Sequence, residues 1–344
     1  MNGLTPQTRE EAILNTLLSA AGGETVNDLT AETRREQWYQ NILDAIKGNN
    51  LTYTLNAEMR REEWLEDFIE AAQEGGGGGA WDKEPPDDGK TRIYIDLPEG
   101  ALEPYIGLKI DGEVDIDWGD GSDADTLEGT STSTRKTLKH TYAAAGKYII
   151  TLDPGMITDI VLDGSTGSGD TYGSRILCYG TSDSATNAIF RNAIRKVYVN
   201  SADIVLGTAA FRYCTGLLEV HILDTTNESI PENAFYGCYS LQKIDISSLV
   251  ASSITEIEKS SFTYVRGGCS FTIPKNVTSI GQYAFQNSSL MELHFKPTTP
   301  PTAGASAFAS LSVNCKIYVP TGKLSEYTGA SNYPSSSTYT YVEE

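Results

Sequence analysis

The stretch FTIPKNVTSIGQYAFQNSSLMEL, residues 271–293, contains one complete copy of the pattern that decides the fold of this chain. Ile280 is followed five positions later by Phe285, and two leucines come next. The same core recurs as LGTAAF, IPENAF and IEKSSF, ending at Phe211, Phe235 and Phe262, and as a degenerate TAGASAF ending at Phe308. Successive phenylalanines lie 24, 27, 23 and 23 residues apart. A period in the twenties predicts a solenoid in which each short unit packs against its neighbours.

The unit reads Ile-x-x-x-Ala-Phe-x-x-Cys-x-x-Leu-x-x-Ile, and over residues 200–333 it resembles the BspA-like leucine-rich repeat. The ending, TPPTAGASAFAS followed by CKIYVPTGKLSEYTGASNY, is similar to the C-terminal cap of that family. The unit Ile257–Phe262 departs from the pattern, with Ser-Ser in place of Ala. We expect the loop Ser261–Ser270 to bulge or to carry specificity. The resemblance implies a surface that binds a partner.

Tyrosines outside the predicted core are the candidate binding residues, because exposed tyrosine is enriched at binding surfaces. They are Tyr213, Tyr236, Tyr239, Tyr264 and Tyr283. The alternative is that they pack within turns. Cys214 and Cys238 share one repeat position, which favours buried thiols that act as small apolar side chains.

The first 74 residues contain a second repeat: TREEAILNTLL from Thr8, TRREQWYQNIL from Thr33 and MRREEWLEDFI from Met59. Each copy places apolar residues at i, i+4 and i+5, on one face of a helix. This predicted anchoring face comprises Ile13, Leu17, Leu18, Trp38, Ile42, Leu43, Trp64, Phe68 and Ile69. Two interpretations remain open: a small three-helix bundle, or faces that dock onto other subunits of an assembly. Gly75–Gly79 then predict a flexible joint, since five glycines lose too much backbone entropy in a helix or strand.

Alternating apolar residues from Thr91 to Leu152, separated by turn residues, predict a small antiparallel sandwich. VDIDWGDGS (114–122) and HTYAAAGKYIITL (140–152) resemble a polycystic-kidney-disease-type (PKD-like) immunoglobulin sandwich. The resemblance implies core positions for Trp118, Tyr142 and Tyr148, and turns at Gly119 and Gly121.

Five aspartates crowd this region: Asp115, Asp117, Asp120, Asp123 and Asp125. Carboxylates that converge would hold Ca²⁺, which takes six to eight oxygen ligands. Their spacing differs from that of an EF-hand loop, and aspartate is also an ordinary turn residue. The sequence predicts no other cofactor, and calcium at these aspartates remains the one candidate.

The sequence therefore predicts a multidomain chain. Helical repeats occupy residues 1–74, a glycine-rich linker 75–90, an all-β PKD/Ig-like sandwich 91–153, and a BspA-like leucine-rich-repeat solenoid with its C-terminal cap 154–344.

Charge and motif content narrow the function. The net charge of −20 disfavours nucleic acid and anionic membrane surfaces as partners. No apolar run reaches the length of a membrane span, and the N-terminus lacks the pattern of a secretory signal. No catalytic motif is present, and His140, His221 and His294 are scattered, so we expect a protein that is not an enzyme.

The resemblance to BspA-like proteins implies one of two settings, because such repeats occur in bacterial surface adhesins and in structural proteins of phages that infect gut bacteria. The N-terminal TRxExxL units are similar to helical repeats that precede receptor-binding modules in such virion proteins. We therefore expect a phage virion appendage on head or tail, assembled in the host cytoplasm as a homo-oligomer. Its partners would be other virion proteins and a host-surface glycan or protein. A bacterial cell-surface adhesin and an intracellular scaffold remain the alternatives.

Overall fold

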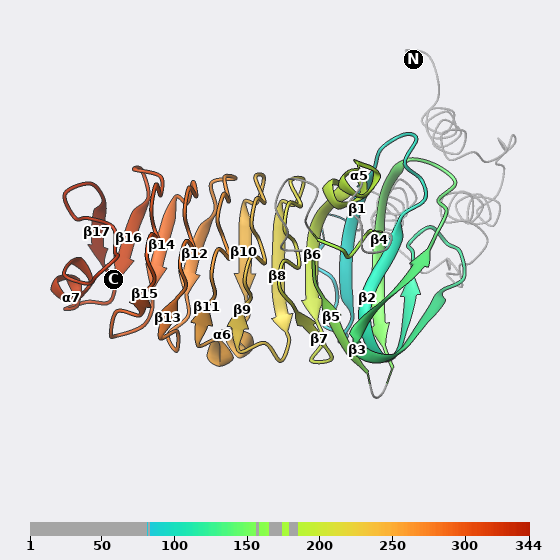
Figure 1. Cartoon of the computed structure of the whole chain (residues 1–344), viewed down its shortest axis with the longest axis horizontal. Helices are drawn as coiled ribbons and strands as arrows, with labels where there is room; N and C mark the ends of the chain where they lie inside the picture. The colour runs from blue at the N-terminus through green and yellow to red at the C-terminus, as the bar shows by residue number, and fades with distance from the viewer. Residues whose placement is uncertain (1–80, 82, 156–157, 165–173, 179–184) are drawn as a thin grey trace, which may run out of the picture. The chain divides into compact units, whose positions relative to one another are not determined.

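The computed structural model describes residues 81, 83–155, 158–164, 174–178 and 185–344 (Figure 1). The chain divides between Pro85 and Pro86, and nearly all of the described residues belong to the unit Pro86–Glu344. The predicted helical repeats of residues 1–74, their anchoring face and the glycines 75–79 lie outside the described residues. No helix among the described residues combines the length and apolarity needed to cross a membrane.

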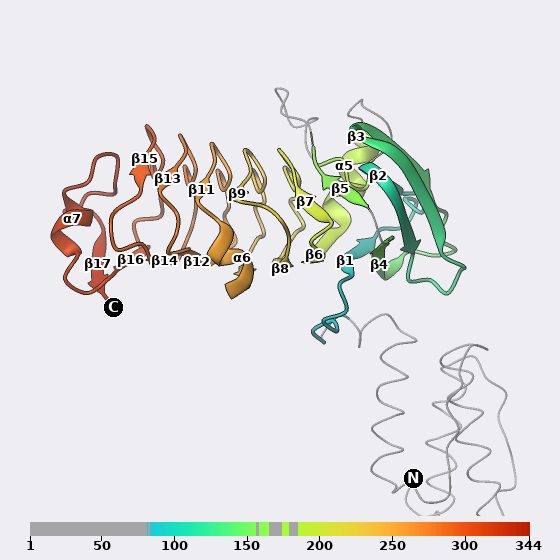
Figure 2. The same ribbon diagram turned by 90° about the horizontal axis from the view of Figure 1, so that it is seen from below.

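The C-terminal part of the unit winds into coils, each with a longer strand on one face and a shorter strand on the other (Figure 2). The longer strands are β6 (Ile194–Asn200), β8 (Glu219–Asp224), β10 (Lys243–Ile246), β12 (Ser270–Ile273), β14 (Glu292–Phe295), β16 (Lys316–Val319) and β17 (Thr340–Glu343). The shorter strands are β7 (Ile204–Leu206), β9 (Ser229–Ile230), β11 (Glu256–Ile257), β13 (Ser279–Ile280) and β15 (Thr302–Ala303). Paired neighbours within each face run parallel, as successive coils of a solenoid must. The predicted solenoid is confirmed.

The repeated phenylalanines form a buried ladder along the solenoid axis. Adjacent rings from Phe211 to Phe308 stack with centroids 5.1 to 5.6 Å apart and planes within 12° of parallel. Backbone hydrogen bonds also connect these turns. The backbone N–H of each of the first four phenylalanines donates to a carbonyl of the next coil at 2.7 to 2.8 Å. Ser261, which replaces the usual alanine, is fully buried, and its hydroxyl donates to Glu258 O at 2.6 Å. This bond satisfies the buried hydroxyl, so the coil accepts the departure from the pattern.

Each phenylalanine turn contains two residues with left-handed backbone. Two positions before the ring they are Ala209, Asn233, Ser260, Tyr283 and Ser306, with φ between 56° and 63°. Two positions after it they are Tyr213, Gly237, Tyr264, Asn287 and Ser310, with φ between 54° and 73°. Small or locally hydrogen-bonding residues tolerate this conformation best. Tyrosine at three of these ten positions is therefore unusual.

The five cysteines are buried free thiols, as expected for structural positions. Cys238 Sγ lies 3.1 Å from Phe211 O, and Ser288 Oγ donates to Phe262 O at 2.7 Å from the equivalent repeat position. Burial raises the pKa of Cys214 to about 12, which keeps this thiol protonated and unreactive.

Residues 91–162 form antiparallel strands that continue both faces of the solenoid. They are β1 (Thr91–Leu97), β2 (Tyr105–Asp117), β3 (Asp125–Lys139), β4 (Gly146–Pro154) and β5 (Asp159–Leu162). β1 pairs with β4 on one side and with solenoid strand β6 on the other, while β5 pairs with solenoid strand β7. β2 pairs with β3 along its length and with both β4 and β5, so it connects the two faces. One nine-stranded sheet thus crosses the predicted domain boundary at 153/154.

Trp118 anchors this region in the core. Its side chain is fully buried, its Nε1 donates to Asp125 Oδ2 at 2.8 Å, and Tyr142 Oη donates to its carbonyl at 2.9 Å. Gly119 has φ 73°, and a Cβ there would overlap the carbonyl of Ile149, so only glycine fits this turn. The apolar core is continuous from β1 to the C-terminal cap. Residues 91–162 therefore cap the N-terminal end of the solenoid, whereas a PKD-like identity stays a prediction.

The C-terminal end is closed by α7 (Leu324–Thr328) and the edge strand β17. Tyrosine hydroxyls connect this cap to the last coils: Tyr327 Oη donates to Pro297 O at 2.6 Å, and Tyr339 Oη donates to Leu311 O at 2.8 Å. A further helix, α5 (Ala185–Ala193), leads into β6.

Candidate binding surfaces of the solenoid

The phenylalanine turns bring four of the five predicted tyrosines to one edge of the solenoid. Tyr213 and Tyr236 meet edge to face at 5.4 Å, and Tyr236 and Tyr264 meet in the same way at 5.6 Å. Tyr239, 42% exposed, follows Tyr236 in the same turn. Tyr283 lies two positions before its phenylalanine, whereas Tyr213 and Tyr264 lie two positions after theirs. It takes no part in these ring contacts. We call the surface formed by Tyr213, Tyr236, Tyr239, Tyr264, Arg212 and Arg266 the aromatic ridge.

Two arginines lie over these rings. Arg212 is buried, and its Cζ lies 5.1 Å from the centroid of Tyr213 and 5.0 Å from that of Tyr236. Arg266 is exposed, and its Cζ lies 5.5 Å from the Tyr239 centroid and 5.2 Å from the Tyr264 centroid. All four contacts have cation–π geometry. Burial raises the pKa of Tyr236 to about 12, so its phenol stays protonated at neutral pH.

A second surface lies where the sheet of longer strands is interrupted. The nine-stranded sheet ends at β10 and a separate four-stranded sheet begins at β12. Helix α6 (Ser248–Ser253) lies at the C-terminal ends of these two strands. Its N-cap Ser247 accepts from Val250 N at 3.2 Å and donates to Leu223 O at 2.6 Å. At the other end of the gap, the segments that lead into the two strands lie close together. A Cβ on Gly267 would overlap the Leu241 carbonyl.

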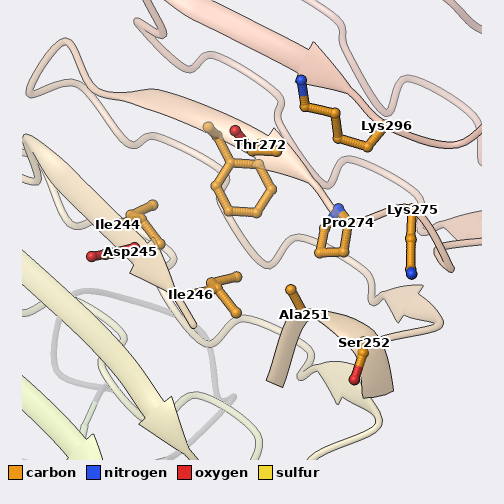
Figure 3. A pocket seen from close by; sticks show the side chains of 10 residues that line it. Ile244, Asp245, Ile246, Ala251, Ser252, Thr272, Pro274, Lys275 and Lys296 are labelled. Atoms are coloured by element: carbon orange, nitrogen blue, oxygen red, sulfur yellow. The ribbon is translucent and has the colours of Figure 1, made fainter. Parts of the chain in front are cut away.

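The resulting wedge pocket has a volume of about 670 Å³ (Figure 3). It is lined by Ile244, Asp245, Ile246, Ala251, Ser252, Phe271, Thr272, Pro274, Lys275 and Lys296. Its walls are mainly apolar. Of the two lysines, Lys296 pairs with Glu344 at 2.6 Å. Such a pocket can take an apolar group with a polar end.

The sequence placed the irregularity of this coil incorrectly. We expected the loop Ser261–Ser270 to bulge or to carry specificity, but Phe262 and Phe271 are separated by nine positions, like Phe235 and Ile244 one coil earlier, so this loop contains no extra residues. The extra residues lie between Ile246 and Ile257, where they form α6. The unequal repeat length indicated an insertion in this unit, but only the structure shows which half of the unit holds it.

The five predicted calcium-binding aspartates do not converge. Asp115 accepts from Thr126 Oγ1 at 2.6 Å, Asp117 from Gly119 N at 2.9 Å, and Asp125 from Trp118. Asp120 pairs with His140 at 2.8 Å, and Asp123 is exposed. Within the described residues no three His, Cys, Asp or Glu side chains are grouped to hold a metal ion. Asp115, Asp117, Asp120 and Asp125 act as turn and strand hydrogen-bond acceptors.

Asp120 provides a pH-dependent contribution to stability. Burial tends to raise its pKa, but hydrogen bonds from Ser122 and His140 outweigh burial and hold the pKa below its usual value. A lowered carboxyl pKa contributes stability above the unfolded-state pKa of about 4, which is lost as the pH falls below it. We expect Asp120→Asn to lower the melting temperature at pH 6, and the difference from the unchanged protein to narrow toward pH 3. A difference that stays constant over this range would contradict the role assigned to Asp120.

The three histidines lie in separate places, each stacked on an aromatic ring. His140 stacks on Trp118 at 4.5 Å, His221 on Tyr198 at 4.2 Å and His294 on Tyr318 at 4.2 Å. Their carboxylate neighbours pair with the imidazole edges, for example Glu219 at 3.3 Å from His221. We interpret all three as structural, and the absence of enzyme activity stays a prediction.

Comparison with known proteins supports the repeat assignment. Residues 185–321 match the family model described as BspA type leucine-rich repeat region, in six copies. Residues 185–321 of the solenoid therefore match BspA-type repeats, as the sequence predicts, and the match does not include residues 91–153. A leucine-rich repeat protein from Bacteroides ovatus, known from a crystal structure, is 21% identical with a TM-score of 0.32. The similarity covers 44% of this chain and 37% of that one. No curated protein matched the chain.

Proposed function

We propose that this chain is a non-enzymatic phage virion appendage. Its BspA-type solenoid is the module that binds a receptor on the host surface. The N-terminal helical repeats would attach the appendage to other virion proteins, with homo-oligomers as the assembled form. The observation that supports receptor binding is the wedge pocket. The sheet of longer strands is interrupted between β10 and β12, and the pocket lies at this interruption.

The virion setting rests on the order of segments in the sequence. A helical repeat region, a run of five glycines and a repeat domain in this order would suit an arm that is attached through its helices and binds through its repeats. The BspA-type repeats favour a bacterial cell-surface adhesin equally, because the family resemblance implies that role too. Both hypotheses place the recognition surface on the solenoid.

Immunogold labelling and mass spectrometry of purified phage particles test the setting. We expect the antibody to label a defined position on head or tail, and peptides of this chain to be present in the particle. Label confined to bacterial envelopes would contradict the virion proposal and support an adhesin.

Filling the wedge pocket tests the binding surface. Ala251 lines the pocket on α6, so Ala251→Trp is expected to occupy the space and to reduce binding of the purified chain to host cells by at least about tenfold. Leu324→Trp, at an exposed position of α7 outside the pocket, is the matched control and should leave binding unchanged. Cell binding is measured by flow cytometry, with melting temperatures to show that both variants fold. Equal binding by Ala251→Trp would remove the pocket from the proposal.

A further inference from the structure

We propose that the exposed end of the aromatic ridge, formed by Tyr239, Tyr264 and Arg266, binds the carboxylate of an acidic sugar within a mostly neutral oligosaccharide. This inference rests on the receptor-binding function proposed above and names the ligand class for a second surface of the same solenoid. Three observations support it: the position of Arg266, the charge distribution around Arg266, and the backbone conformation of Tyr264.

Arg266 is an exposed cation held in place without a carboxylate partner. Two rings contact its guanidinium, with Cζ 5.5 Å from the Tyr239 centroid and 5.2 Å from the Tyr264 centroid. No described carboxylate lies within salt-bridge distance of it, although acidic residues outnumber Lys and Arg by 46 to 26 in the chain. Because ring faces accept no strong hydrogen bond, the N–H groups of this guanidinium are available to a ligand. A planar guanidinium forms bidentate hydrogen bonds with carboxylates.

The turns around Arg266 are depleted of acidic residues. The five phenylalanine turns, residues 209–218, 233–242, 260–270, 283–291 and 306–315, contain no Asp or Glu, and their only charged residues are Arg212 and Arg266. The chain as a whole carries −20. Solvent ions screen distant charges over about 8–10 Å, so a ligand at this edge experiences mainly the local positive charge. A long polyanion would extend beyond the edge and be repelled, which favours a ligand with a single carboxylate.

Tyr264 is retained at a backbone position that disfavours it. Its φ is 61°, and the equivalent positions of three other coils hold Gly237, Asn287 and Ser310. A bulky residue with left-handed backbone carries strain of about 1 kcal/mol or more, and such strain is concentrated at functional sites. The fully buried phenylalanine ladder, rather than these tyrosines, supplies the core of the coils. The ring of Tyr264 contacts both Tyr236 and Arg266, and we assign to it the role of holding Arg266 at the exposed end of the ridge.

An oligosaccharide fits this surface better than a protein does. The C–H face of a sugar ring packs against an exposed aromatic ring, and Tyr239 offers one beside the guanidinium. Protein interfaces instead depend on anchors buried in well-packed pockets, and the wedge pocket is formed by a different set of residues.

Calorimetric titration of the full chain tests the proposal with two matched pairs of probes: 3′-sialyllactose against lactose, and cellobiouronic acid against cellobiose. We expect at least one acidic sugar to bind, and its neutral partner to bind about ten- to hundredfold more weakly, as the loss of charged hydrogen bonds predicts. Arg266→Gln should reduce the affinity for the acidic sugar to that for the neutral one. Arg266→Lys, which keeps the charge but not the planar fork, should give an intermediate affinity.

Two further variants complete the design. Tyr264→Gly removes the ring and suits the left-handed backbone, so it should fold normally and lose affinity for the acidic sugar. Lys316→Gln removes an exposed positive charge outside both the ridge and the wedge pocket, and should bind the acidic sugar as the unchanged protein does. The proposal is overturned if neither acidic sugar binds at millimolar concentration, if acidic and neutral sugars bind equally, or if Arg266→Gln binds unchanged. It is also overturned if an acidic peptide, and no sugar, occupies the ridge.

Cell binding separates this inference from the function on which it rests. If Arg266→Gln binds host cells normally while Ala251→Trp does not, receptor binding stands and the ridge inference fails. If the unchanged protein binds neither cells nor phage particles, the proposed function fails regardless of the sugar titrations.

Discussion

Replacing Phe262 by alanine is expected to lower the free energy of unfolding by about 3–5 kcal/mol. Phe262 lies in the middle of the ladder and is 1% exposed. Its ring centroid lies 5.3 Å from that of Phe235, 5.1 Å from Phe285 and 4.7 Å from Phe271. Removing it leaves a cavity between two coils that rigid neighbouring turns cannot close.

Equilibrium denaturation in urea measures this loss. Met291→Ala is the control, because Met291 is 63% exposed and its truncation should change stability by no more than about 0.5 kcal/mol. A loss for Phe262→Ala as small as that of the control would show that the stacked rings are not the core of the coils.

Replacing Ile95 by alanine should destabilise the solenoid as well as the N-terminal cap, by about 2–5 kcal/mol in total. Ile95 is fully buried in β1, where it pairs with Tyr148 of β4 on one side and with Ile194 of β6 on the other. Because β1 is shared between antiparallel cap and parallel solenoid, the two parts should unfold together. Amide hydrogen exchange is expected to increase in β6 and β8 along with β1 and β4.

Ile189→Ala provides the matched control for this experiment, since Ile189 is the same residue type but 44% exposed in α5. Faster exchange confined to β1–β4, with unchanged protection in β6 and β8, would indicate that the cap folds as a separate module, as the sequence pattern predicts for residues 91–153.

The periodic features of this fold were predictable from the sequence, and the long-range ones were not. The phenylalanine ladder follows from spacing alone, because residues one coil apart must stack. Arg92 pairs with Tyr198 between the neighbouring strands β1 and β6, which are more than a hundred residues apart in the chain. No local sequence pattern encodes this pairing. Strand character in both segments was visible, but the continuity of their sheet required the structure.

The candidate sites show the same division. Tyr213, Tyr236 and Tyr264 gather because they follow equivalent phenylalanines by one or two positions, whereas Tyr283 precedes its phenylalanine by two. Arg266 was not named as a candidate, although it lies in the loop Ser261–Ser270, which we expected to bulge or to carry specificity. The aspartates of residues 115–125 do not group into a metal site within the described residues, and four of them accept hydrogen bonds from Thr126, Gly119, Ser122 and Trp118 instead.

The central position of β1 also determines how this protein responds to mechanical force. A load applied to the N-terminal segment while the solenoid is held enters the unit through β1, whose register spans seven residue pairs with β4 and four with β6. A pull along that strand shears its hydrogen bonds all together, whereas an edge strand peels away one bond at a time. The strand at the entry point is therefore loaded in shear, and it should resist rupture more than an edge strand would.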